Sequence, residues 1–410
     1  MTASPAKRRL VIVQYSGDYR DAFHRIKSGS GETYYAHKYV LESLQRLCAD
    51  AVDEIVVLHA FSGSKYDEYL TPCLRVVSTG FDIERDRKNL LGVLGSLQPT
   101  YLALLYPSKD VFKWAIKHRI KTLGILADSF SADTLRGKIR DLRLGRTLNH
   151  PTIEWVANHG INACKSLESI GVKAHKILPW DWPHPRSPAD FSPKTLRQGE
   201  QPWRLAYVGG VHEVKGVLNI LEAMAILRQK SIATEIKIAG RGDLERFKAM
   251  AADLGVGDCV QFLGSIANGQ IVDPLMREAD CVVVPSHHQY PEGLPLTIYE
   301  ALTARTPLIA SDHPMFMGNL EHEVSALIFP ADSSQALADR IQQLMNSPEL
   351  YRQLSQRSEA AWQRLQIPLK WADLIGYWLE QSPESKQALQ GHSIKTRTQP
   401  PANRPLALAE

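Results

Sequence analysis

The chain has 410 residues and a mass of 45.9 kDa, which allows two medium-sized domains and leaves little room for a third. Hydrophobic residues make up 44% and charged residues 22%, so the composition excludes a wholly disordered or fibrous chain. The formal net charge is only +4, from 48 basic and 44 acidic side chains, which argues against a dedicated nucleic-acid-binding protein.

The first half of the chain alternates short apolar runs with amphipathic stretches. The apolar run at 10–13 is too short for a signal peptide or a membrane span and predicts a first buried strand of a cytoplasmic protein. Ala36, Val40, Leu44 and Leu47 share the spacing of one helix face. The predicted strands of this half are 9–14, 54–59, 74–78, 101–106, 122–127 and 153–157.

The second half repeats the alternation. Its predicted strands are 204–208, 235–239, 259–263, 280–284, 307–310 and 326–329. Its predicted helices are 216–228, 244–254, 296–304 and 335–345. Regular succession of strand and helix indicates parallel sheets covered on both faces. The sequence therefore predicts an α/β protein with two Rossmann-like lobes.

Proline sets the boundaries between the predicted lobes, because it continues neither a helix nor a central strand. Prolines crowd the segment from 179 to 202. We predict an N-terminal Rossmann-like lobe at 1–180, a linker at 181–202 and a C-terminal Rossmann-like lobe at 203–365. A helix at 366–381 is expected to pack back on the N-terminal lobe, and residues 382–410 are expected to form a disordered tail.

Five cysteines are scattered along the chain and form no C-x-x-C pair. They are Cys48, Cys73, Cys164, Cys259 and Cys281. We expect small core residues in a reduced compartment, without disulfides or a zinc site.

A glycine-containing loop follows the predicted strand 204–208. It runs from Gly209 and Gly210 to Lys215 and Gly216 and opens a helix. Glycines let backbone N–H groups approach a ligand, a helix N-terminus favours an anion, and Lys215 adds a positive charge. The loop is thus a candidate cradle for a diphosphate, with ordinary turn chemistry as the alternative.

A second loop, after the predicted strand 280–284, carries two acids eight positions apart. Pro295 suits the first helical position, which would leave the N–H groups of Gly293 and Leu294 free at the helix mouth. Glu292 lies in the loop and Glu300 on the following helix, so both could accept hydrogen bonds from sugar or ribose hydroxyls. The alternative is a pair of solvated surface acids.

These motifs, in this order and spacing, resemble the C-terminal lobe of a GT-B glycosyltransferase of family 4. The resemblance covers about 200–346 and rests on the 209–216 loop, on 238–243, 260–264 and 279–286, and on Glu292-x7-Glu300. It is thinner over the N-terminal lobe, where it rests on 28–32 and on the segment from Asn162 to Pro179. It implies a GT-B fold with two lobes facing across a cleft, and retaining sugar transfer from a nucleotide-sugar donor. On this resemblance the lobe at 1–180 would bind the acceptor and the lobe at 203–365 the nucleotide-sugar donor.

The resemblance also implies roles for individual residues. Glu300 would hold the donor ribose, Glu292 would touch the donor sugar, and Lys215 would neutralise the leaving diphosphate. The remaining donor-binding residues implied are Gly31, Gly209, Gly210, Arg241, Leu263, Gly293, Leu294 and Leu296. No metal ion or other cofactor is expected, and no ligand cluster is evident in the sequence.

Two positions depart from the family pattern. Many relatives carry an arginine where this chain has Gly210, and His212 or Arg241 could compensate. A histidine common after the fifth strand of the first lobe is replaced by Asp128, which either contacts a sugar hydroxyl as a catalytic-site residue or caps a helix.

Residues 136–146 contain five cations and one acid, with Ile139, Leu142 and Leu144 interleaved. This stretch could rest on an anionic membrane at the inner face and meet a lipid-linked acceptor, or it could be a solvated helix face. The aromatic pair Trp180 and Trp182 could stack on a sugar or pack at the hinge.

The expected partners are a nucleotide-sugar donor and a glycan or lipid-linked acceptor of cell-surface polysaccharide, lipopolysaccharide or glycolipid synthesis, and no nucleic acid. Two alternatives remain open on the same fold. One is a nucleotide-sugar epimerase, and the other is an inactive sugar-nucleotide-binding partner subunit.

Overall fold

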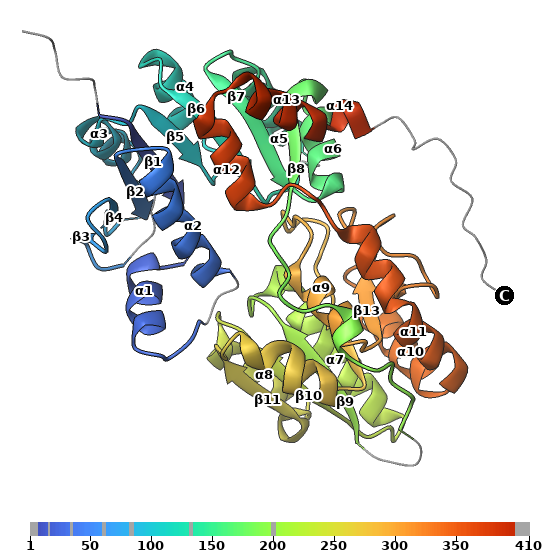
Figure 1. Ribbon diagram of the computed structural model, residues 1–410. Coiled ribbons are helices and arrows are strands. Elements are labelled where there is room, and N and C mark those ends of the chain that lie inside the picture. The colour runs from blue at the N-terminus through green and yellow to red at the C-terminus, as the bar shows by residue number, and fades with distance from the viewer. Residues whose placement is uncertain are drawn as a thin grey trace, which may run out of the picture. The chain divides into compact units, whose positions relative to one another are not determined.

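A computed structural model describes residues 7–14, 17–32, 36–59, 63–81, 86–130, 134–197 and 202–397 (Figure 1). The chain divides into two compact units. Unit 1 comprises Met1–Lys27, Ala36–Trp182 and Ile367–Glu410, and unit 2 comprises Ser28–Tyr35 and Pro183–Gln366. Each unit is an α/β layer structure with its own sheet.

Unit 1 is built on an eight-stranded sheet in the order β3-β4-β2-β1-β5-β6-β7-β8. The strands are β1 (Arg9–Gln14), β2 (Glu54–His59), β3 (Tyr66–Tyr69), β4 (Leu74–Ser78), β5 (Tyr101–Leu104), β6 (Lys121–Leu126), β7 (Ile153–His159) and β8 (Ile177–Trp180). All pairings are parallel except that of β3 with β4. The sequence did not predict β3 or β8. Pro179 is tolerated in β8 because this strand lies at the edge of the sheet, where proline costs no ladder hydrogen bond.

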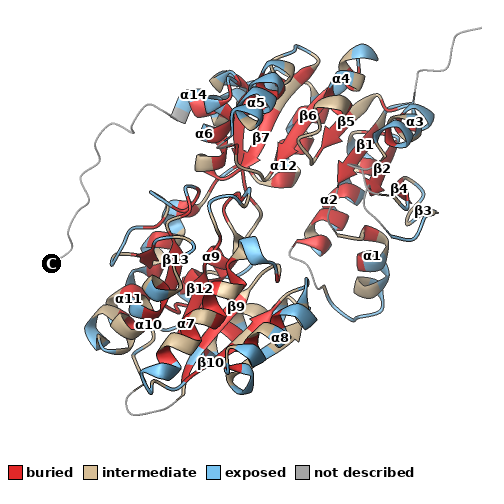
Figure 2. Ribbon diagram, turned by 180° about the vertical axis from the view of Figure 1, so that it is seen from behind, coloured by how far each residue is buried: buried red, intermediate tan, exposed pale blue. Residues whose placement is uncertain are grey.

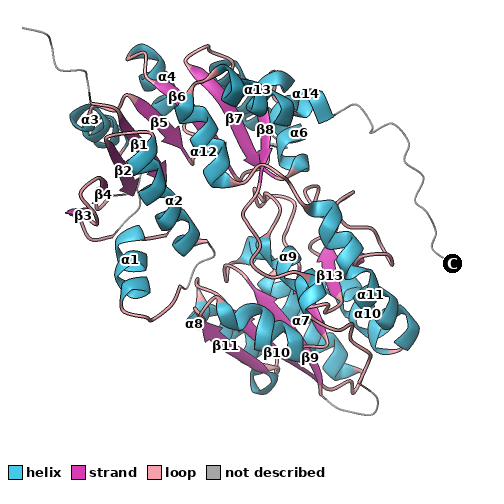
Figure 3. Ribbon diagram, in the orientation of Figure 1, coloured by secondary structure: helices cyan, strands magenta, loops and turns pink. Residues whose placement is uncertain are grey.

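Helices cover both faces of this sheet (Figure 3). They are α1 (Tyr19–Lys27), α2 (His37–Asp50), α3 (Arg87–Leu97), α4 (Lys109–Lys117), α5 (Leu135–Leu148), α6 (Ile161–Ser169), α12 (Trp371–Glu380), α13 (Pro383–His392) and α14 (Ile394–Arg397). The core of one face takes side chains from α3 to α6, and the core of the other takes them from α1, α2, α12 and α13.

Helix α12 buries an apolar stripe in the core of unit 1. Trp371, Leu374, Ile375 and Trp378 are each at most 1% exposed and belong to the core of unit 1. Trp182 stacks on Trp371 with ring centroids 6.0 Å apart, which is packing within unit 1. These contacts place the segment after Ile367 in the first unit although it follows the second in the chain.

The structure corrects the expectation of a disordered tail from residue 382. Helix α13 begins at Pro383, and the Ser382 side chain accepts a hydrogen bond from the Ser385 N–H as an N-cap. Leu389 and Ile394 are 1% and 5% exposed, so this segment has apolar side chains that unit 1 buries. Residues 398–410 lie outside the described residues.

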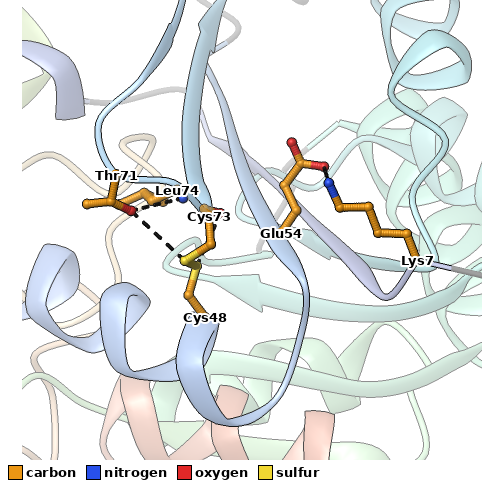
Figure 4. Close-up of a disulfide and its surroundings, with 6 residues drawn as sticks. All are labelled: Lys7, Cys48, Glu54, Thr71, Cys73 and Leu74. Atoms are coloured by element: carbon orange, nitrogen blue, oxygen red, sulfur yellow. Dashed lines mark hydrogen bonds and ion pairs between the residues drawn. A yellow bond between two sulfur atoms is a disulfide. The ribbon is translucent and has the colours of Figure 1, made fainter.

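The expectation that no cysteine forms a disulfide is wrong for one pair. Cys48, near the end of α2, is bonded to Cys73, which directly precedes β4, with Cα atoms 6.0 Å apart (Figure 4). The two residues are 25 positions apart in the sequence, and only the packing of α2 against the sheet brings them together. Cys164, Cys259 and Cys281 form no disulfide.

Unit 2 is built on a six-stranded parallel sheet in the order β11-β10-β9-β12-β13-β14. The strands are β9 (Trp203–Val208), β10 (Thr234–Ala239), β11 (Val260–Gly264), β12 (Cys281–Val284), β13 (Leu308–Ser311) and β14 (Leu327–Phe329). The helices are α7 (Val217–Gln229), α8 (Leu244–Asp253), α9 (Leu296–Thr303), α10 (Ser334–Met345) and α11 (Pro348–Leu365). All predicted strands and helices of this half are present within two residues of the expected bounds.

Most of the predicted linker packs on unit 2, whose second segment begins at Pro183. Arg197 donates two hydrogen bonds to the carboxylate of Asp280, at 2.8 and 2.5 Å, and Asp280 is only 2% exposed. The Lys194 ammonium donates to the Arg277 carbonyl at 2.9 Å. A buried carboxylate needs a cation of this kind, so residues 183–197 are part of the second unit.

Candidate functional site

The candidate site lies where the strand order of unit 2 reverses. The chain builds β9, β10 and β11 outward in one direction and then returns to place β12 on the other side of β9. Because the strands are parallel, the loops after β9 and β12 leave the same edge of the sheet side by side, which is where open α/β sheets bind ligands. These two loops carry Lys215 and Glu292.

Most backbone N–H groups of the loop after β9 donate hydrogen bonds within the loop or to carbonyls at and just after the end of β10. Gly209 donates to the Ala239 carbonyl at 3.0 Å, and Val211 donates to the Arg241 carbonyl at 2.8 Å. The N–H of Gly210 donates to no described residue, and its carbonyl accepts from the Tyr207 hydroxyl at 2.7 Å. The loop after β9 therefore offers a diphosphate fewer open backbone donors than the sequence indicated.

Gly216, the N-cap of α7, fixes the distance between the two loops. Its φ is 74°, a left-handed conformation, and an added Cβ would lie 2.2 Å from the Pro285 carbonyl oxygen at the end of β12. Any side chain here would force the loops after β9 and β12 apart.

We expect Gly216→Ala to cost about 2 kcal/mol more of unfolding free energy than Gly255→Ala, measured by urea denaturation. Gly255 is the matched control because its φ is 69° and nothing lies within 4 Å of an added Cβ. Both variants pay the left-handed backbone penalty, and only Gly216→Ala adds the clash with Pro285. Equal destabilisation of the two variants would contradict this account of the loop spacing.

Lys215 and Glu292 form a half-buried ion pair. The Lys215 ammonium donates to Glu292 Oε1, and the side chains are 15% and 8% exposed. The ammonium also lies 4.2 Å from the ring centroid of Tyr290, within the range of a cation–π contact. Glu292 is thus not the solvated surface acid of the alternative interpretation.

Residues that the sequence did not single out hold Glu292 and its loop. The Ser286 hydroxyl donates to Glu292 Oε1 at 2.6 Å. His313 Nε2 lies 3.0 Å from the Tyr290 carbonyl, while its Nδ1 accepts from the Met315 N–H at 3.1 Å, so the proton belongs on Nε2. Burial lowers the pKa of His313, which keeps the ring neutral. No sequence signal marks His313, since it follows another strand, β13.

The start of α9 leaves backbone donors open beside the ion pair. The helix begins at Leu296, so Pro295 occupies the cap position. The sequence predicts Pro295 at the first helical position instead. The N–H groups of Gly293, Leu294, Leu296 and Thr297 donate to no described residue. The Thr297 hydroxyl donates to the Val208 carbonyl at 2.9 Å, which fixes this helix end against the end of β9.

Glu300 lies in a different surrounding from Glu292. It lines a cavity of about 290 Å³ in unit 2, together with Leu296, Tyr299 and Thr303 of α9. Its side chain makes no hydrogen bond with a described residue, and burial raises its pKa from 4.5 to about 7. The remaining lining residues of the cavity are Glu32, His184, Pro185, Arg186, Asn268, Gly269 and Val272.

The other predicted donor-binding residues are placed around this edge without contacting the ion pair. The Arg241 side chain donates to the Ser265 hydroxyl at 3.0 Å, and Leu263 is half-buried near the end of β11. Gly31 is exposed, and its neighbour Glu32 accepts a hydrogen bond from the Asn268 N–H at 3.0 Å. The segment with Gly31 thus belongs to unit 2, although the sequence placed it in the N-terminal lobe.

Asp128 lies in unit 1, just after β6. It does not cap α5, because Thr134 fills that position and accepts from the Gly137 N–H. Asp128 Oδ2 is buried and has no hydrogen-bond partner among the described residues. Burial raises the pKa of Asp128 to about 6. The structure therefore excludes Asp128 as the cap of α5.

Within the described residues, no group of three or more His, Cys, Asp or Glu side chains is arranged to hold a metal ion. The adjacent histidines 287 and 288 have separate partners. His287 Nε2 lies 2.6 Å from Asn219 Oδ1, and His288 Nε2 lies 2.7 Å from Asp312 Oδ1.

Comparison with known proteins decides the fold. The structure superposes on sucrose-phosphate synthase from Thermosynechococcus elongatus with a TM-score of 0.65 at 16% identity, covering 92% of this chain and 99% of that one. HepE from Anabaena in complex with UDP-glucose matches with a TM-score of 0.62 at 16% identity, again over 92% and 99% of the two chains. The chain has the GT-B fold.

The match to a family model lies in the second half of this GT-B chain. Residues 189–361 match the family model of glycosyl transferases group 1. The amylovoran biosynthesis glycosyltransferase AmsK of Erwinia amylovora is 34% identical over 155 residues, which is 37% of this chain and 38% of that enzyme. The chain spans less than half the length of the first curated relatives it matches. The matched region contains both loops of the candidate site.

Proposed function

We propose that this protein is a retaining glycosyltransferase of family 4 that moves a sugar from a nucleotide-sugar donor to a glycan or lipid-linked acceptor. The observation that carries the proposal is the Lys215–Glu292 pair at the strand reversal of unit 2, beside the unused N–H groups at the start of α9. A cation and a set of free backbone donors at one sheet edge suit a diphosphate.

In the proposed reaction, Lys215 and the α9 N–H groups stabilise the negative charge that grows on the leaving diphosphate. Without substrate, Glu292 neutralises Lys215. A bound diphosphate would take over the ammonium, and Glu292 would then accept hydrogen bonds from hydroxyls of the transferred sugar. Electrostatic stabilisation of a leaving group in this way is commonly the largest single contribution to catalysis.

Glu300 is proposed to hold the donor ribose. Its cavity combines the apolar side chains of Leu296 and Val272 with the carboxyl group of Glu300, as expected of a nucleoside pocket. Two ribose hydroxyls would satisfy a carboxyl group that has no partner among the described residues. The UDP-glucose complex of HepE, a protein of the same fold, supports testing UDP-sugars first.

The retaining outcome is part of the proposal. The leaving phosphate would accept the proton of the acceptor hydroxyl. The acceptor would attack the same face of the sugar from which the phosphate departs, so no separate protein base is required. Asp128 is assigned a contact with a sugar hydroxyl, which is supported by a buried Oδ2 that has no hydrogen-bond partner among the described residues. No metal ion is assigned a role, and we expect a chelator to leave the rate unchanged.

We place the activity in the synthesis of a cell-surface polysaccharide, lipopolysaccharide or glycolipid. The similarity to an amylovoran biosynthesis enzyme supports the polysaccharide class. The identities of the sugar, the nucleotide and the acceptor are to be determined by experiment.

A thermal-unfolding screen with UDP-, GDP- and ADP-sugars tests the donor assignment. A donor present at 100 times its Kd is expected to add about 2.7 kcal/mol to the unfolding free energy. The matched control is the free sugar without nucleotide, which should not stabilise the protein. Failure of every nucleotide to stabilise it would contradict the proposal, and conversion of the donor sugar without any acceptor would indicate an epimerase.

A further inference from the structure

The outer face of α5 carries an exposed aliphatic stripe. Leu135, Ile139 and Leu142 are 74%, 41% and 49% exposed, at helix positions i, i+4 and i+7 that share one face. Three of the seven large exposed hydrophobic residues in the described part of the chain are on this helix. Figure 2 shows this face of α5 in the colour of exposed residues.

Packing prevents α5 from turning this stripe inward. The opposite face of the helix buries Leu144 and Leu148, which are 5% and 0% exposed and belong to the core of unit 1. The stripe is therefore a fixed feature of the surface, and no described neighbouring element covers it.

Five cations surround the stripe. At 100° per residue, Arg146 lies within it, Lys138 lies on one side, and the others lie on the opposite side. The full set is Arg136, Lys138, Arg140, Arg143 and Arg146. The single acid, Asp141, is 4% exposed and accepts a hydrogen bond from Arg140 Nε at 2.9 Å, so it pairs with one of the five cations and leaves the other four in excess.

We propose that this face, defined as Leu135, Ile139 and Leu142 with the five cations of α5, docks on a membrane surface that contains anionic lipids. The aliphatic side chains would enter the boundary between headgroups and acyl chains, while the long basic side chains reach phosphate groups beside them. A nucleic acid would use the cations but gain nothing from the aliphatic stripe. None of the helices in the described part of the chain has the length and apolar content of a bilayer span.

Vesicle co-sedimentation of the full chain tests the proposal. We expect binding to vesicles of phosphatidylcholine with phosphatidylglycerol, little binding to phosphatidylcholine alone, and weaker binding at high salt. Leu135→Ser with Ile139→Ser and Leu142→Ser should lower the partition coefficient at least about tenfold. Arg136→Gln with Arg143→Gln and Arg146→Gln should lower it by a similar factor.

The matched control removes three exposed cations elsewhere, with Lys237→Gln, Lys248→Gln and Arg352→Gln, and should bind like the original chain. All replaced side chains are exposed, so unfolding temperatures should stay close to the original. Wild-type protein that ignores anionic vesicles would overturn the proposal. Unchanged vesicle binding by the aliphatic triple variant would also overturn it, because the binding would then depend on charge alone, as at a site for any polyanion. Donor binding is measured separately, so this result leaves the proposed function unaffected.

Discussion

Replacing Lys215 by methionine is expected to lower kcat/KM for the donor at least about 100-fold, which corresponds to about 3 kcal/mol of transition-state stabilisation. Methionine keeps most of the length of the side chain and removes its charge. The ammonium is held over Tyr290 and against Glu292, so it needs little reorganisation to meet a diphosphate. Steady-state rates with a nucleotide-sugar found in the donor screen provide the measurement.

Two controls separate chemistry from folding in this experiment. Lys215→Met leaves Glu292 buried without its cation, which destabilises the ligand-free protein. The double variant Lys215→Met with Glu292→Gln should recover stability and stay inactive. Lys230→Met removes an exposed lysine that pairs with Asp339, and it should retain the original rate. Full activity of Lys215→Met would remove the basis of the proposed mechanism.

Replacing Glu300 by glutamine is expected to raise the unfolding free energy of the ligand-free protein above that of the wild type, and to do so more at about pH 8 than at about pH 5. The folded pKa of Glu300 is about 7, above its ordinary value of 4.5. Between these values the folded state holds a proton that the unfolded state has lost, so the wild-type protein loses stability as pH rises through this window. The loss is complete above the folded pKa and amounts to about 3 kcal/mol.

Urea denaturation across this pH range gives the readout as a difference between curves. Glutamine cannot ionise, so the curve for Glu300→Gln should lack the decline that the wild-type curve shows. Glu245→Gln is the control, because its side chain is 87% exposed and its curve should parallel the wild type. Parallel curves for Glu300→Gln as well would show that Glu300 is not held protonated by burial.

Glu300→Gln should also weaken donor binding, by a factor of about 10 to 100, if a carboxylate accepts the ribose hydroxyls. This arm depends on the proposed function, whereas the pH dependence of the ligand-free protein does not. A changed pH profile with unchanged donor affinity would therefore keep the burial of Glu300 and reject its role in binding.

The sequence predicted local elements well and tertiary contacts poorly. Strands such as β2 and β4 have their expected bounds because a continuous apolar run between turn residues has few other solutions. The edge strand β3 was missed because its Tyr-Asp-Glu-Tyr sequence has no apolar run. Helix α13 was missed because its apolar content is low, although its burial of Leu389 is nearly complete.

The same division holds within the candidate site. The positions of Lys215 and Glu292 on loops after strands followed from the order of motifs. His313 and Ser286 were not predicted, because their roles depend on hydrogen bonds to Tyr290 and Glu292 that have no sequence signature.

The amino-acid sequence by itself determined the two α/β halves, the strand–loop–helix units and the residues at their turns, because these depend on short-range periodicity and on proline and glycine. The tertiary structure alone decided which distant residues meet. It paired Cys48 with Cys73, brought α13 and α14 into unit 1, and placed Lys215 against Glu292. Such contacts depend on strand order, and strand order is fixed by how whole layers bury their apolar faces.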